Sequence, residues 1–284
     1  MSISKIGVVG VGAMGSGIAQ VAAQAGLKVI LVDIEQSFID KGMINIVKNW
    51  DKDLKKGKIS EEQKASFVGN IATSVDKTVL SDCNLVVEVI IENIDNKKQL
   101  FKELNDICAP TSIIATNTSG FSITEIAAAS CRPDRVVGTH FFNPVPVMRL
   151  VEVIPGEETS RETVEAAMEF CKIIGKTAIE AKEAPGFIVN RLLVPYLNDA
   201  CHAYGEGVAS AKDIDEAMTL GANMPIGPLA LCDLVGIDVL LMVTEYFFKE
   251  FGDPKFRPAL AMKQKVRAGH LGIKTGKGFY DYNK

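Results

Sequence analysis

The sequence has few of the residues that build metal or redox sites. It contains three histidines and six cysteines, and no two cysteines have the Cys-x-x-Cys spacing. Zinc sites and dithiol redox motifs need such clusters, so we expect neither a metal site nor a redox motif. Scattered cysteines are typical of a reducing compartment, and no basic segment followed by an apolar run opens the chain. We therefore expect a cytoplasmic protein.

The sequence also lacks a large excess of one charge and a long apolar run. Its formal net charge is −4, which gives no reason to expect a nucleic-acid partner. The most apolar late stretch, residues 229–243, is interrupted by Asp233, Gly236 and Asp238 and is shorter than the roughly 20 apolar residues of a membrane span. We therefore expect no membrane association and interpret this stretch as part of a buried helix over residues 229–251.

Short apolar runs rich in β-branched residues alternate with longer amphipathic stretches up to about residue 182. This alternation is typical of an α/β fold with a mainly parallel sheet covered by helices. A helical arm is expected near residues 36–68, where Ser60 and Gln63 have the spacing of a capping box. The expected strands lie at 6–10, 29–33, 71–75, 85–90, 113–117, 136–141, 150–154 and 177–181.

The pattern changes after Pro185-Gly186, beyond which helical periodicity prevails. We therefore expect two domains, an α/β domain over residues 1–184 and an all-helical domain over residues 185–284. Apolar helices beside a domain that has its own core often bury a subunit interface, so we predict a homodimer through the helical domain. Its expected helices lie at 187–204, 211–220, 229–251 and 258–268.

A glycine-rich turn joins the first expected strand to a helix expected at residues 18–25. Gly10, Gly12 and Gly15 have the Gly-x-Gly-x-x-Gly spacing of the Rossmann fold, in which the turn and the helix N-terminus bind a pyrophosphate. Asp33 ends the next strand about 20 residues later, where this fold places the acid that binds the adenosine ribose. An acid there repels a 2′-phosphate, so we expect NAD, with NADP still possible. The glycines alone are equally well explained as a structural turn.

His140 is the candidate acid/base, since it ends an apolar strand at the edge where open α/β sheets bind ligands. The prolines at 144 and 146 then force a bend before the next strand. If the two strands pair about Pro146, Glu152 lies opposite His140. A carboxylate in an apolar run needs a partner, and this one would fix the imidazole tautomer and stabilise the imidazolium. A buried hydrogen bond without a catalytic role is the alternative.

Further polar residues follow the other expected strands. Asn117 and Ser119 lie at the carboxyl end of the fifth strand, and Ser119 could face Asn190 of the first helix of the second domain. Glu92 and Lys97 could reach the nicotinamide side of a dinucleotide, and Glu88 is equally ambiguous. In the alternative interpretation, Ser119 is a helix N-cap and Asn190 an ordinary helix residue.

Five lysines cluster around Trp50 in the expected arm. They would suit a substrate that carries phosphates and an adenine ring, although a solvated helix face is the commoner explanation. The cluster consists of Lys48, Lys52, Lys55, Lys56 and Lys58.

These motifs together resemble the 3-hydroxyacyl-CoA dehydrogenase family over nearly the whole chain. The segments at 140–148, His-Phe-Phe-Asn-Pro-Val-Pro-Val-Met, and at 185–191, Pro-Gly-Phe-Ile-Val-Asn-Arg, are the most specific. The glycine motif is not specific. Further matches lie at 117–119, 150–152, 227–228 and 274–280.

The resemblance implies roles for individual residues. His140 is implied as the catalytic base with Glu152 as its partner, and Ser119 and Asn190 as the groups that hold the substrate C3 oxygen. The glycines, Asp33, Glu92, Lys97, Asn117, Ser119, Asn143 and Lys274 are implied at the cofactor; Ser119, His140, Asn143, Asn190, Lys52 and Lys56 are implied at the acyl-CoA.

The expected reaction is therefore hydride transfer between NAD(H) and C3 of a short-chain L-3-hydroxyacyl-CoA. Two alternatives stay open. One is a dehydrogenase of a sugar acid or other small hydroxy acid without coenzyme A, for which the lysine cluster would be dispensable. The other is a non-catalytic NADH-binding protein on the same scaffold.

Overall fold

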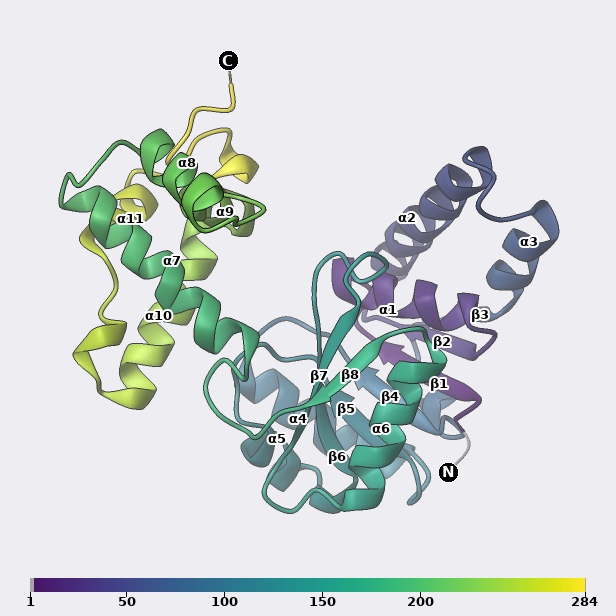
Figure 1. The fold of residues 1–284 in the computed structure, drawn as a ribbon. Helices are drawn as coiled ribbons and strands as arrows, with labels where there is room; N and C mark the ends of the chain where they lie inside the picture. Colours follow the sequence, from purple (N-terminus) through teal and green to yellow (C-terminus); the bar gives the residue numbers. More distant parts are fainter. Residues whose placement is uncertain (1–2, 284) are drawn as a thin grey trace. The chain divides into compact units, whose positions relative to one another are not determined.

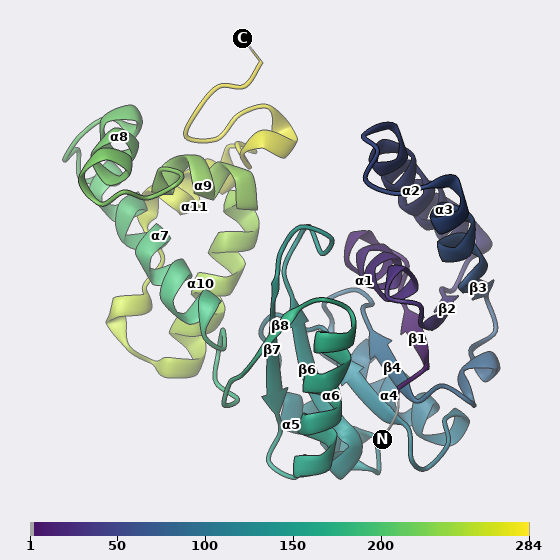
Figure 2. The ribbon, with the colours of Figure 1, turned by 45° about the vertical axis from the view of Figure 1, so that its right-hand side comes forward.

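The computed structural model describes residues 3–283. The chain divides into two compact units, residues 1–184 and residues 185–284. Figures 1 and 2 show a sheet with flanking helices in the first unit and an array of helices in the second.

One eight-stranded sheet forms the centre of the first unit, in the order β3-β2-β1-β4-β5-β6-β7-β8. All eight expected strands are confirmed to within two residues at either end. Their bounds are Lys5–Val9 (β1), Lys28–Val32 (β2), Ile71–Ser74 (β3), Leu85–Glu88 (β4), Ile113–Thr116 (β5), Val136–Phe141 (β6), Leu150–Pro155 (β7) and Thr177–Glu180 (β8).

The direction of the strands decides which residues meet at one edge of the sheet. The first six strands are parallel, and β7 runs antiparallel to β6. The carboxyl ends of β1, β2, β4, β5 and β6 therefore lie at the same edge as the start of β7. This is the edge at which open α/β sheets bind their ligands.

Helices cover both faces of the sheet because the strands are apolar on both sides. Alternate strand residues such as Val8 and Val151 share a core with α1 (Ala13–Gln24) and α6 (Arg161–Ile173). The other face carries α4 (Ile94–Ile107) and α5 (Ile123–Ala129), which lie behind the sheet in Figure 1, whereas α6 lies in front. The first helix begins at Ala13, five residues before the expected start, directly after Gly12, whose backbone is extended.

The arm consists of α2 (Gln36–Lys55) and α3 (Glu61–Gly69). Ser60 accepts a hydrogen bond from the Gln63 amide, and the Gln63 side chain accepts one from the Ser60 amide, so the expected capping box is confirmed. Trp50 is fully buried in α2, and its ring lies 5.6 Å from that of Phe67 in α3.

The second unit consists of helices around its own apolar core, which includes Leu197, Leu229 and Phe247. The single helix expected over residues 229–251 is wrong, because two helices cover this range. Gly236 separates them with a φ of 102°, and its amide still bonds to the Cys232 carbonyl. An α-helix cannot continue through that backbone conformation. The helices are α7 (Val189–Gly205), α8 (Ala211–Gly221), α9 (Pro228–Val235), α10 (Ile237–Phe251) and α11 (Leu260–Arg267).

Four short 3₁₀ helices complete the described elements: Lys77–Leu80, Pro133–Arg135, Pro254–Phe256 and Ile273–Thr275. Within residues 3–283, none of the helices combines the length and the apolar character needed to cross a bilayer.

Candidate active site

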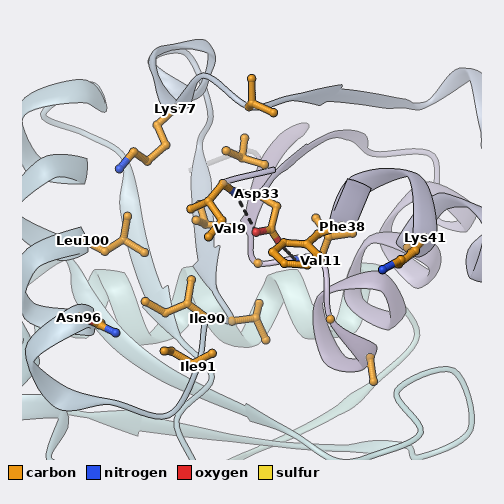
Figure 3. A pocket seen from close by; sticks show the side chains of 18 of the residues that line it. Val9, Val11, Asp33, Phe38, Lys41, Lys77, Ile90, Ile91, Asn96 and Leu100 are labelled. Carbon is orange, nitrogen blue, oxygen red and sulfur yellow. Dashed lines mark hydrogen bonds between the residues drawn. The ribbon is translucent and has the colours of Figure 1, made fainter. Parts of the chain in front are cut away.

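A pocket of about 710 Å³ opens beside the glycine turn. It is lined by Gly10 and Gly12, by Asp33, and by residues of α2 and α4 (Figure 3). In that view Phe38 and Lys41 lie on one side of Asp33, and Lys77 and Leu100 lie on the other. The pocket therefore lies at the carboxyl ends of β1 and β2, where the sequence predicts the cofactor.

The three glycines of the turn differ in what a side chain at each position would contact. A Cβ on Gly15 would lie 1.9 Å from the Gly10 carbonyl oxygen, and Gly10 has a φ of 103° beside the Val89 backbone. A Cβ on Gly12 would meet no protein atom within 4 Å. The protein's own packing thus requires Gly10 and Gly15, whereas at Gly12 only a ligand would be obstructed by a side chain.

The N-terminus of α1 begins at this same turn. Its N-cap is Gly12, no side chain caps it, and its first turn holds no acidic residue. The free N–H groups and the positive end of the helix dipole are suited to a negatively charged group. The turn therefore fits the pyrophosphate of a dinucleotide.

Asp33 is held by two backbone amides. Its Oδ2 accepts a hydrogen bond of 2.7 Å from Val11 N–H in the glycine turn, drawn in Figure 3, and its Oδ1 accepts one of 2.7 Å from Ile34 N–H. A carboxylate oxygen can accept a second hydrogen bond. Asp33 can therefore bind ribose hydroxyls while it shapes the glycine turn.

His140 and Glu152 face each other across the antiparallel pair of β6 and β7, as the register about Pro146 predicts. The distance from His140 Nδ1 to Glu152 Oε2 is 2.7 Å. Glu152 is fully buried and His140 is 4% exposed. The carboxylate can therefore orient the ring through Nδ1, and Nε2 is the other ring nitrogen that can carry a proton. The Phe142 ring packs 4.5 Å from the imidazole ring.

The polar residues after β4 and β5 form a connected set. Glu92 Oε1 accepts hydrogen bonds from the Thr118 hydroxyl and from Ser119 N–H, and Glu92 Oε2 pairs with Lys97. Asn117 accepts a hydrogen bond from Phe141 N–H, next to His140. Ser119 is not a helix N-cap, because Ser122 has that role for α5. Ser119 is left exposed, with its backbone held by Glu92.

A second pocket, of about 300 Å³, lies between the arm and the loop after β6. Lys52 and Lys48 line it from α2, and Asn143 lines it from the loop. The structure thus brings Lys52 and Asn143 to one cavity. Lys56, at the C-cap of α2, does not line it.

Two of the expected site residues belong to the helical unit. Asn190 lies in the first turn of α7. Lys274 Nζ lies 2.6 Å from Asp238 Oδ1, at the start of α10.

Sequence reasoning missed several residues that line the larger pocket: Ile34, Phe38, Lys41, Val75 and Lys77. Ile34 is 81% exposed and Val75 is 53% exposed, which is suited to contact with an adenine ring. The sequence signal for this lining is the pair of apolar residues shortly after Asp33, namely Ile34 and Phe38.

Comparison with known proteins agrees with the motifs. The family model of the 3-hydroxyacyl-CoA dehydrogenase NAD binding domain matches residues 5–184, and the model of the C-terminal domain of the same family matches residues 186–282. The chain belongs to the 3-hydroxyacyl-CoA dehydrogenase family.

Individual members of this family match over their full length. The 3-hydroxybutyryl-CoA dehydrogenase of Clostridioides difficile is 47% identical over 280 residues, which cover 99% of this chain and 100% of that protein. A probable 3-hydroxybutyryl-CoA dehydrogenase of Bacillus subtilis is 45% identical over 284 residues, which cover 100% and 99%. The crystal structure of the (S)-3-hydroxybutyryl-CoA dehydrogenase of Ralstonia eutropha superimposes with a TM-score of 0.98 at 47% identity and covers all of both chains.

Proposed function

We propose that the chain interconverts L-3-hydroxybutyryl-CoA and acetoacetyl-CoA with NAD(H), with His140 as the acid/base. The observation that carries this proposal is the buried His140–Glu152 pair, 2.7 Å apart, at the sheet edge that also holds the glycine turn. Family membership and the full-length relatives support the substrate class.

The proton chemistry follows from the His140–Glu152 pair. In the oxidation direction, His140 Nε2 takes the proton of the C3 hydroxyl, and Glu152 stabilises the imidazolium that forms. In the reduction direction, the imidazolium returns this proton to the C3 oxygen. The bound nicotinamide supplies or accepts the hydride. Because reduction consumes an imidazolium proton, its rate falls at high pH.

The substrate oxygen needs donors besides the imidazole. Ser119 and Asn190 are proposed to donate hydrogen bonds to it, which would polarise the carbonyl of a 3-oxoacyl group. Support for Ser119 comes from its exposure and from the Glu92 contact that holds its backbone. For Asn190, support comes from the Pro-Gly-Phe-Ile-Val-Asn-Arg match to the family.

The remaining contacts are proposed for the cofactor and the coenzyme A. Asp33 favours NAD over NADP because its carboxylate repels a 2′-phosphate, and Asn117, Glu92, Lys97 and Lys274 complete the cofactor site. Asn143 and Lys52 share the smaller pocket, which supports binding of the acyl-CoA there. Lys56 would reach its phosphates from the end of α2.

The helical unit is proposed to form a homodimer interface. It exposes several large apolar side chains, among them Leu192 at 70%, Leu220 at 84% and Leu234 at 59%. Burial of such side chains against a second copy would remove them from water. Multi-angle light scattering should give two chains per particle, and a mass of one chain would contradict this proposal. A cytoplasmic location is supported by the six free cysteines.

One assay tests the reaction and its main competitor together. NADH oxidation is followed with acetoacetyl-CoA and with free acetoacetate, each also with NADPH. We expect turnover with acetoacetyl-CoA and NADH, and weak activity with the free acid. Equal activity on both acids would favour a dehydrogenase that does not recognise coenzyme A. NADH binding without turnover of either would favour a non-catalytic protein.

A further inference from the structure

Glu88 is a buried carboxylate to which the proposed reaction gives no role. It ends β4, is fully buried, and accepts three hydrogen bonds from different segments. Its Oε1 accepts from Lys97 Nζ at 2.7 Å and from Ile90 N–H at 2.8 Å, and its Oε2 accepts from the Thr116 hydroxyl at 2.7 Å. Glu88 thus ties α4 and β5 to the end of β4, at the edge of the sheet where the site lies.

Lys97 connects this carboxylate to a second one. Its side chain is 1% exposed, and its Nζ lies 2.7 Å from Glu88 Oε1 and 3.2 Å from Glu92 Oε2. A buried ammonium needs such partners, because an uncompensated buried charge is costly. Glu88 therefore holds the Lys97 ammonium in place, and this ammonium in turn pairs with Glu92, whose side chain is 36% exposed.

Glu92 in turn holds the segment that carries Ser119. Its Oε1 accepts the Ser119 N–H at 3.1 Å and also bonds to the Thr118 hydroxyl. That hydroxyl is the acceptor for the amides of Gly120 and Phe121, at 3.3 and 3.0 Å. Ser119 is exposed, so packing does not fix it, and its place depends on these polar contacts.

We propose that Glu88 is a positioning residue that fixes Ser119 through Lys97 and Glu92. This inference rests on the proposed function, in which Ser119 binds the substrate C3 oxygen. A small displacement of a group that orients the substrate lowers kcat strongly, whereas the same displacement has little effect on the fold. Loss of the Glu88 charge should therefore impair the chemistry, and it should also lower the stability, because the buried Lys97 loses the nearer of its two carboxylate partners.

The test variant is Glu88→Gln, which keeps the shape and removes the charge. Its matched control is Asp215→Asn, because Asp215 is also buried and accepts three hydrogen bonds, from Leu229, Ala230 and Tyr280, but lies in α8 of the second unit. Thr116→Val is a second test variant, which removes one donor to Glu88, and with it the acceptor of Thr118 N–H, without changing any charge.

Amide hydrogen exchange reports how firmly the segment around Ser119 is held, and it does not require a catalytic assay. We expect a peptide covering residues 117–121 to exchange about tenfold faster in Glu88→Gln than in the parent, because local opening becomes easier. Thr116→Val should also exchange faster here, and Asp215→Asn should show no change in this peptide. Unchanged exchange in Glu88→Gln would overturn the inference, even if the protein proved inactive on acyl-CoA.

A double-mutant cycle with Ser119→Ala then measures whether Glu88 affects kcat through Ser119. We expect Glu88→Gln to lower kcat for acetoacetyl-CoA by roughly 10- to 100-fold, as for a misplaced orienting group. The Kd for NADH is measured beside it, because Lys97 and Glu92 are also proposed at the cofactor. In the Ser119→Ala background the same substitution should lower kcat less than threefold, because coupled residues are not additive. Full additivity would show that Glu88 acts independently of Ser119 and would overturn the inference.

Discussion

His140 Nδ1 lies 2.7 Å from Glu152 Oε2, between two residues that are direct partners in the register of β6 and β7. The two residues are twelve positions apart in the chain and lie on consecutive strands, so the pairing of one hairpin sets their contact. Because Glu152 is fully buried, its carboxylate needs partners from the protein, and His140 is one of them.

Replacement of His140 by Gln should abolish turnover and spare binding. We expect kcat to fall by about 100- to 10,000-fold, the usual range for loss of an acid/base group. NADH binding, measured by fluorescence titration, should stay near that of the parent. His202→Gln is the control, since His202 is a half-buried histidine of α7 to which the proposed reaction gives no role. A folded His140→Gln protein with near-normal turnover would refute the assignment.

The Glu152→Gln protein should be impaired less, by about 100-fold in kcat, because the ring loses its orienting charge but stays in place. The pH profile of reduction should shift as well, since the imidazolium loses its partner. Glu180→Gln is the control on the adjacent strand β8, where the side chain pairs with Arg161. An unchanged profile would make Glu152 a structural acid.

Asp33→Asn tests the cofactor end of the site. The Asn side chain keeps one oxygen, so it can accept from only one of the two amides, that of Val11 or that of Ile34, and it loses the charge. We expect the Kd for NADH to rise about tenfold, the effect of one charge-assisted hydrogen bond, and the preference over NADPH to narrow. Fluorescence titration with both nucleotides measures this. An unchanged ratio would mean that Asp33 has no part in the choice.

Trp50 allows a stability test in the arm. Its side chain is fully buried, and its Nε1 has no hydrogen-bond partner among the described residues. Trp50→Ala should lower the free energy of unfolding by about 3–5 kcal/mol. Trp50→Phe should lower the free energy of unfolding by less than about 1.5 kcal/mol, because it removes the unsatisfied N–H donor and only part of the side-chain volume. Urea denaturation measures both, and equal losses would contradict this account.

The cysteines should differ sharply in reactivity. Burial raises the pKa of the thiols of Cys83 and Cys171 to about 12 and that of Cys108 to about 11. The thiolate is the nucleophile, so a raised pKa leaves these groups protonated and unreactive at pH 8. Cys131 is exposed. Iodoacetamide should therefore label one cysteine of the folded protein, and Cys131→Ser should remove that labelling.

Much of the first unit follows from local sequence patterns. The strands are recognisable because β-branched apolar runs are bounded by polar segments, and the His140–Glu152 pairing follows from two-residue alternation about Pro146. The break at Gly236 did not follow, because a glycine inside an apolar helical pattern is usually tolerated. The partners of Glu88 could not be assigned either, since Lys97 and Thr116 come from separate elements.

The reversal of strand direction at β7 has a consequence for the proposed acid/base pair. Both residues belong to the first unit, on adjacent strands of one hydrogen-bonded sheet. A slip of one residue in the register of β7 would turn Glu152 to the opposite face of the sheet and separate it from His140. The loop between β6 and β7, which sets this register, therefore decides whether the imidazole keeps its carboxylate.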